Sequence, residues 1–191
     1  MKLKKDTKTT TIVGIDYSLT SPAICINFGL GYKFSYLTNK KKWIGMISED
    51  IIGYSHSEYD TPIRRFTQIS DFILNICKQL DNPIVFIEGY SFGSKGQGIF
   101  QIAENCGILK YRLQEEKIPY ETIVPSVVKK GATGKGNADK DMMYESFVKE
   151  TKINLKKLFD TEKVGNPISD IVDSYYIQKV GYENSSCNNI K

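Results

Sequence analysis

The sequence predicts one mixed α/β domain, built on a five-stranded mixed sheet with helices on both faces. Short β-branched and apolar runs joined by tight turns come first, and they indicate a three-strand antiparallel meander. Longer segments with apolar residues every three or four positions then alternate with further apolar runs. Strands linked through such helices pair in parallel through right-handed crossovers. A chain of 191 residues is long enough for one domain with a sizeable core.

The first half of the chain is predicted to form the meander, a long helix and a fourth strand. The meander strands are expected at Thr11–Tyr17, Ala23–Phe28 and Tyr32–Leu37. Residues 39–59 show no clear period, so we expect an irregular insertion or a hairpin in which Trp43 is a packing anchor. Thr61 and Pro62 open an amphipathic helix that ends near Leu80, before the strand Ile84–Ile87.

The second half is predicted to add helices and one more strand. We expect a helix over residues 99–113, a strand over 119–124, a short helical turn over 126–130, a glycine-rich loop over 131–137 and a helix over 138–150. The last helix is expected to begin at Asn166-Pro167 and to end near Val180.

The ends of the chain and the cysteines predict the bounds of the folded domain and its cellular location. We expect a disordered basic lead-in over residues 1–10, the folded domain over 11–181 and a disordered tail over 182–191. The lead-in lacks the apolar stretch of a signal peptide, and no run is long enough to span a membrane, which predicts a cytoplasmic protein without a membrane partner. Reduced thiols, rather than disulfides or a zinc site, are expected at Cys25, Cys77, Cys106 and Cys187.

Acidic residues end two of the predicted strands. Asp16 follows the first apolar run, and Glu88 follows the run Ile84–Ile87. An acid at the end of a buried strand indicates the wet edge of a sheet or a functional site. If these two strands are parallel neighbours, the two carboxylates lie side by side.

Two further acids lie in the last predicted helix. Asp170 and Asp173 are three residues apart, so they share one face of its first two turns. An acid at the end of a strand is often structural, and two Asp residues three apart on a helix often face solvent. The occurrence of four such acids on three elements nevertheless predicts a single site. Four carboxylates repel one another, and an all-oxygen ligand set suits Mg²⁺ or Mn²⁺. Two such ions could support phosphodiester hydrolysis.

Lysines are concentrated between Lys129 and Lys157, where eight lysines stand against four acids. This excess indicates an anionic partner such as a nucleic-acid backbone, or equally a solvated helix face. The glycine-rich loop over residues 93–98 contains Lys95 but lacks the spacing of a phosphate-gripping P-loop. We expect it to contact DNA, because glycines let a backbone approach phosphates closely.

Five segments together resemble the RuvC-type Holliday-junction resolvases of the RNase H-like superfamily, and the divergent phage-type members in particular. These segments are residues 12–16, 86–93, 103–110, 129–140 and 167–173. The resemblance spans residues 11–181 and implies an RNase H-like nuclease domain. It implies a homodimer that resolves four-way DNA junctions by paired nicks, in the cytoplasm of a bacterial host if a phage encodes the protein.

The resemblance also implies roles for individual residues. Asp16, Glu88, Asp170 and Asp173 would be the catalytic metal ligands, with Mg²⁺ as the cofactor and Mn²⁺ as its substitute. Essential basic residues would correspond to Lys140 and to one of Lys129 and Lys130, with Lys135 in the same glycine-rich turn. Ser91 stands where cellular members carry a junction-wedging aromatic, so its neighbours Tyr90 and Phe92 are expected either to stack on DNA or to pack in the core.

Three other functions remain open from the sequence. A nuclease of the same fold could cut branched DNA more broadly, and a non-catalytic module could bind junctions without cutting them. The segment from Val13 to Thr20 also resembles the first phosphate loop of actin-like sugar kinases, which share the strand order. A kinase of that kind would need a second phosphate loop and a larger chain.

Overall fold

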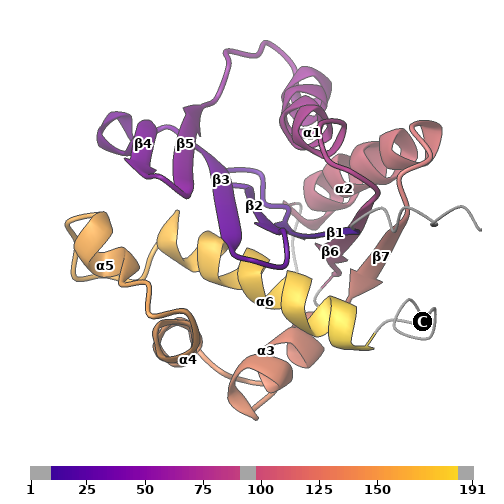
Figure 1. Cartoon of the computed structure of the whole chain (residues 1–191). Coiled ribbons are helices and arrows are strands. Elements are labelled where there is room, and N and C mark those ends of the chain that lie inside the picture. Colours follow the sequence, from indigo (N-terminus) through magenta and orange to yellow (C-terminus); the bar gives the residue numbers. More distant parts are fainter. Residues whose placement is uncertain (1–9, 91–97, 185–191) are drawn as a thin grey trace, which may run out of the picture.

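A mixed sheet lies at the centre of the fold, with helices on both of its faces (Figure 1). The structure is a computed structural model that describes residues 10–90 and 98–184. Within these ranges seven strands pair in the order β4-β5-β3-β2-β1-β6-β7. The strands are β1 (Thr11–Asp16), β2 (Ala23–Asn27), β3 (Tyr32–Thr38), β4 (Gly45–Ser48), β5 (Ile51–Ser55), β6 (Pro83–Glu88) and β7 (Tyr120–Ile123). The helices are α1 (Pro62–Cys77), α2 (Gly98–Glu115), α3 (Pro125–Thr133), α4 (Lys140–Thr151), α5 (Leu155–Leu158) and α6 (Ile168–Asn184), with a 3₁₀ turn, η1 (Lys41–Trp43).

The α/β class, the mixed sheet and the helices on both faces are confirmed, but the prediction of five strands is wrong. β1, β2 and β3 form the expected antiparallel meander, and β6 and β7 add to it in parallel. The two extra strands come from residues 39–59, where β4 and β5 form an antiparallel hairpin and β5 pairs in parallel with β3. Buried Trp43 and Ile51 fasten this segment to the core, a tertiary contact that leaves no period in the sequence.

Alternate residues of the central strands face opposite helical layers. Val13 and Ile15 pack in the core that includes residues of α1 and α2. Ile12 and Phe86 pack in the core that includes residues of α3, α4 and α6. Because helices cover both faces of the sheet, the central strands are apolar at consecutive positions and do not alternate between apolar and polar residues.

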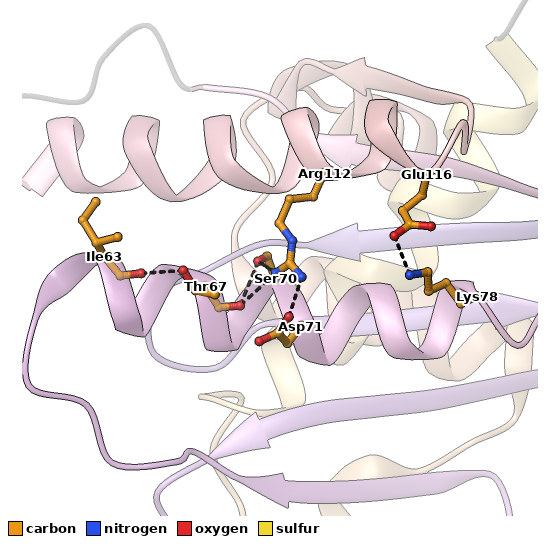
Figure 2. A network of polar contacts seen from close by, with 7 residues as sticks. All are labelled: Ile63, Thr67, Ser70, Asp71, Lys78, Arg112 and Glu116. Carbon is orange, nitrogen blue, oxygen red and sulfur yellow. Dashed lines mark hydrogen bonds and ion pairs between the residues drawn. The ribbon is translucent and has the colours of Figure 1, made fainter.

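A polar network joins α2 to α1 on the first of these faces. Figure 2 shows Arg112 of α2 lying above Thr67, Ser70 and Asp71 of α1. The Arg112 guanidinium donates hydrogen bonds to the Thr67 carbonyl oxygen at 3.2 Å and to the Ser70 hydroxyl, and it pairs with Asp71 at 2.5 Å. A second ion pair, Lys78–Glu116, lies farther along the two helices and is more exposed to solvent. The two helices are therefore fixed to each other as well as to the sheet.

Two helices extend beyond their predicted ends. α3 continues to Thr133, past the short turn expected over residues 126–130, because Gly131 packs against Val180 of α6 and Gly134 ends the helix in the left-handed conformation. α6 continues to Asn184, three residues beyond the expected domain end, because Gly181 packs closely against Phe86 and Ile123. Residues 1–9 and 185–191, for which disorder was expected, lie outside the described ranges.

The described cysteines agree with the expectation of reduced thiols. Cys25, Cys77 and Cys106 are buried free thiols, and Cys187 lies outside the described residues. No helix in the described ranges combines the length and the apolar character needed to cross a membrane.

Candidate active site

Two neighbouring strands deliver Asp16 and Glu88 to the same place. β1 and β6 are parallel, and Ile15 of β1 pairs with Ile87 of β6. Asp16 and Glu88 are the next residues on the two strands, so they lie side by side. Asp16 lies on the same side of β1 as Gly14, whose backbone contacts α6, and Glu88 lies on the same side of β6 as Phe86. Both acids therefore point toward the face that α6 covers. The sequence predicts only that they lie side by side if their strands are parallel neighbours, and β1 and β6 are such neighbours.

Helix α6 brings Asp170 and Asp173 to the same edge. The helix packs along β1, and Gly14 leaves room for it, since a Cβ at that position would stand 2.2 Å from the Ser174 carbonyl oxygen. Asp16 and Asp170 are buried, and Asp173 and Glu88 are partly buried. Asp170 and Asp173 thus approach Asp16 and Glu88 from the face of the sheet that α6 covers.

The four acids affect one another's ionisation. Burial raises the pKa of Asp16 well above its usual value, and the charges of Asp170, Asp173 and Glu88 raise it further. Burial, followed by the charges of Glu88 and Asp170, raises the pKa of Asp173 to about 7. The pKa of Glu88 is also raised by burial, although Lys129 opposes that shift. The structure therefore brings together all four acids that the sequence singled out.

Asp170 lies at the centre of a small polar network. The Ser169 hydroxyl lies 3.3 Å from Asp170 Oδ1 and 3.3 Å from Asn166 Oδ1, and it accepts a hydrogen bond from Lys140 Nζ at 3.2 Å. Burial raises the pKa of Asp170, while the Ser21 hydroxyl, the Lys140 charge and the Ser169 hydroxyl lower it. Asp170 Oδ2 is buried and has no hydrogen-bond donor among the described residues.

Two pockets flank the acids. One, of about 170 Å³, is lined by Asp16 and Glu88 together with mainly apolar and aromatic residues, which are Tyr17, Gly89, Tyr90, Ile99, Ile102, Cys106 and Pro125. The other, of about 90 Å³, is lined by the two cations Lys129 and Lys140 and by two acids, Asp139 and Asp173, together with Ala138, Met143, Ser169 and Val172. The acids therefore lie between a mainly apolar pocket and a smaller pocket that contains two lysines.

The residues expected to contact DNA are distributed around these pockets. Lys129 and Lys140 line the smaller pocket, and their charges lower the pKa of Asp173. Lys130 and Lys135 are exposed on α3 and on the turn that follows it.

Tyr90 is partly exposed at the apolar pocket, with Lys110 Nζ 5.2 Å from the centre of its ring. Phe92 and Lys95 lie outside the described residues.

Sequence reasoning did not find Ser169, Asn166 and Ser21. The hydroxyls of Ser169 and Ser21 act on Asp170, and Asn166 contacts the Ser169 hydroxyl. Polar residues of this kind are common in loops and at helix starts. Ser169 precedes Asp170 directly, and this adjacency is the one signal that could have pointed to it.

The donor set suits a divalent cation such as Mg²⁺ or Mn²⁺. The four acids supply only oxygen atoms, and the unpartnered Asp170 Oδ2 is a buried acceptor whose demand a cation would satisfy. In the described part of the chain, however, no three Asp, Glu, His or Cys side chains are already arranged so that they could hold a metal ion. The acids are thus close enough to influence one another's charge, and their side chains would have to close in to enclose an ion.

Comparisons with known proteins bear on the fold and the family. Comparison with curated proteins finds no match. The fold resembles Thermus thermophilus RuvC in complex with a Holliday junction substrate, at 15% identity and a TM-score of 0.59 over 89% of this chain and 91% of that one. It also resembles a second Thermus thermophilus RuvC structure, at 14% identity and a TM-score of 0.55 over 91% of this chain and 95% of that one.

A third similar structure is the yeast mitochondrial Holliday junction resolvase Ydc2, at 17% identity and a TM-score of 0.52 over 97% of this chain and 85% of that one. At these identities the likeness shows the shared fold. Residues 23–170, more than three quarters of the chain, match the family described as crossover junction endodeoxyribonuclease RuvC. The matched segment includes Glu88, Lys129, Lys140 and Asp170, and the chain belongs to the RuvC family.

Proposed function

We propose that this protein is a divalent-metal-dependent endonuclease that resolves four-way DNA junctions by hydrolysing phosphodiester bonds. The observation that carries the proposal is the meeting of Asp16, Glu88, Asp170 and Asp173 at one edge of the sheet, in a chain of the RuvC family. Burying four carboxylates together is costly unless protons or cations neutralise them. Because such a cluster does not stabilise a fold, its presence favours catalysis over a purely binding role.

In this proposal the four acids hold Mg²⁺ or Mn²⁺. Bound there, such ions would lower the pKa of a water molecule and stabilise the charge on the leaving oxygen. The chain itself supplies the carboxylates, and the Ser169 hydroxyl and Lys140 hold Asp170 in its orientation. Protons that the acids carry at low pH have to leave before they can act as ligands.

The lysines supply the complementary charge. Lys129 and Lys140 line the pocket beside Asp173, where they would bind the phosphates that flank the scissile bond. Lys130 and Lys135, exposed close by in the sequence, and Lys95 would extend the contact along the backbone. Tyr90 lies at the other pocket, where its ring would stack on a base or sugar at the junction, and Phe92 remains a second candidate for that role.

Two opposed nicks need two active sites, so we extend the proposal to a homodimer with one site per subunit. The substrate of such an enzyme would be DNA in the cytoplasm, where junctions arise during recombination, repair and phage replication. Two structures of the same fold support this substrate class: one is described as a Holliday junction resolvase, and the other is a RuvC in complex with a Holliday junction substrate.

Cleavage of labelled DNA tests the proposal. A four-way junction, a three-way branch and a linear duplex of matched sequence are incubated with the protein and Mg²⁺, and again with a chelator. Paired, symmetrical nicks in the four-way junction alone, lost with chelator, are expected. Equal cutting of all branched substrates would instead indicate a general debranching nuclease, and binding without any metal-dependent cutting would indicate a junction-binding module.

A further inference from the structure

The segment over residues 39–55, between β3 and α1, contacts the chain that leads into α6. Trp43 lies at the centre of these contacts and is buried in the same core as α6. Its carbonyl oxygen accepts a hydrogen bond from the Tyr36 hydroxyl at 2.6 Å, and its indole N–H donates to the Phe159 carbonyl oxygen at 3.1 Å. Trp43 therefore joins β3 to the residue that follows α5.

Aromatic packing strengthens this joint. The ring of Phe159 lies edge-on to Trp43, with centroids 5.6 Å apart, and 5.8 Å from the ring of Tyr36. Gly53 of β5 completes the arrangement, because a Cβ there would stand 2.1 Å from the Trp43 carbonyl oxygen. The start of the segment between α5 and α6 is thus held by a packed aromatic cluster of Tyr36, Trp43 and Phe159.

Lys40 holds the other end of that segment. Its Nζ donates a hydrogen bond to the Asn166 carbonyl oxygen at 2.8 Å and lies 4.4 Å from the centre of the Trp43 ring. Asn166 stands two residues before α6, and its side-chain oxygen lies 3.3 Å from the Ser169 hydroxyl. The Ser169 hydroxyl in turn contacts Asp170 Oδ1. A continuous series of contacts thus runs from Lys40 to an acid of the site.

We propose that Lys40 and Trp43 are positioning residues, which fix residues 159–167 so that α6 begins where Asp170 meets Asp16. This inference rests on the proposed function for its effect on cleavage, while its structural part stands without it. It assigns a role to the inserted segment of residues 39–55: the segment braces the start of the acid-bearing helix from the edge of the sheet. Lys40 and Trp43 touch no reacting atom in this scheme and act through Asn166 and Phe159.

The test compares Lys40→Met with Lys41→Met. Both variants remove one positive charge from the same exposed turn, but Lys40 makes the contact to Asn166. Two readouts are taken from each protein. Amide hydrogen exchange is measured at Ser169 and Ile171, whose N–H groups donate to Gly165 and Pro167 in the first turn of α6. Single-turnover cleavage of the four-way junction and junction affinity in chelator are measured alongside.

We expect Lys40→Met to speed exchange at these two amides several-fold and to slow cleavage about tenfold, since small displacements of catalytic groups reduce rates strongly. Junction affinity should stay within about twofold of the Lys41→Met value, because both variants lose the same charge. Lys40→Arg, which keeps a donor, should restore both readouts in part. Trp43→Phe, which keeps a ring but loses the indole donor, should reproduce the effect of Lys40→Met.

Equal exchange and equal cleavage in Lys40→Met and Lys41→Met would overturn the inference. Faster exchange with unchanged cleavage would also overturn it, because the brace would then have no effect on the site. If the wild-type protein cuts no DNA, the proposed function fails, and the exchange comparison alone decides whether Lys40 fixes the start of α6.

Discussion

Gly14 of β1 lies directly against the backbone of Ser174 in α6, so closely that a Cβ on Gly14 would stand 2.2 Å from the Ser174 carbonyl oxygen and 2.4 Å from the Gln178 nitrogen. Gly14 precedes Asp16 by two residues, and Ser174 follows Asp173 directly. The absence of a side chain at Gly14 therefore sets how near the acid of the strand comes to the acids of the helix.

Gly14→Ala should displace α6 from β1. The methyl group would meet backbone atoms that cannot move separately, so we expect the free energy of unfolding to fall by about 3 kcal/mol and cleavage to be lost. Urea denaturation measures the first effect. Gly107→Ala in α2 is the matched control: nothing lies within 4 Å of a Cβ there, and the change should stabilise the protein by about 0.5–1 kcal/mol. Equal stability of the two variants would contradict this account of the packing.

Asp16→Asn should separate catalysis from binding. It removes a proposed metal ligand and a buried charge, so cleavage should fall more than about a hundredfold while junction affinity is kept or improved. The metal-free protein should also become more stable by about 1 kcal/mol at pH 8, because repulsion with Asp170 and Asp173 is relieved. Cleavage assays and thermal melts in chelator check both effects. Normal cleavage by this variant would refute the metal site.

The stability of the metal-free protein should depend on pH. Asp173 has a pKa of about 7, and burial also raises the pKa values of Asp16, Glu88 and Asp170. An acid whose pKa is raised by folding binds its proton more tightly in the folded state. Its stabilising contribution is therefore complete below the unfolded pKa and is lost as the pH rises through the folded pKa.

We therefore expect the free energy of unfolding, measured in chelator, to fall between about pH 5 and pH 8. Asp173→Asn should flatten this dependence, and an unchanged slope in that variant would assign the effect to other groups. Mg²⁺ should become less effective at stabilising the protein as the pH falls below about 7, since protons then compete for the same oxygens.

Lys140→Met should weaken the reaction without unfolding the protein. Lys140 is exposed apart from its contact to Ser169, so the melting temperature should change little. Cleavage should slow about tenfold, and the slope of log affinity against log salt should decrease by about one. Lys33→Met is the control, because Lys33 lies on β3 near the end of the sheet opposite Asp16. Equal effects of the two changes would show Lys140 to be an ordinary solvated lysine.

Arg112→Met should destabilise the packing of α2 on α1. It removes hydrogen bonds to Thr67 and to buried Ser70, together with the pair to Asp71, and we expect a loss of about 1–2 kcal/mol. Lys78→Met removes a more exposed ion pair and should cost less than about 0.5 kcal/mol. Urea denaturation of both variants distinguishes them, and a larger loss from Lys78→Met would contradict the ranking.

The sequence predicted well those elements in which buried apolar residues recur at regular intervals along the chain. Helix α1 shows the clearest case: its buried residues Phe66, Ile69, Ile73 and Cys77 recur every three or four positions after a Thr cap. The pairing of Asp16 with Glu88 was also predictable, because it follows from the parallel order of two apolar strands.

Long-range contacts explain what the sequence did not reveal. β5 exists as a sheet strand because it pairs with β3, and α3 extends because Gly131 meets Val180. β3 and Val180 lie too far along the chain from the residues they contact for these contacts to appear as a periodic pattern in the sequence. In the site, the acids were recognisable from their apolar surroundings, whereas Ser169 and Asn166 gain their importance from contacts with Lys140 and Lys40.

The placement of the acids also has a consequence for synthesis on the ribosome. Most of the described chain separates Asp16 on β1 from Asp173 on α6, which is the last helix of the described residues. A nascent chain that still lacks α6 leaves one face of β1 uncovered and holds only half of the carboxylates. If the protein has the proposed function, the ability to cut DNA would thus arise only once α6 has been made and packed, so chains released before α6 would carry no nuclease activity.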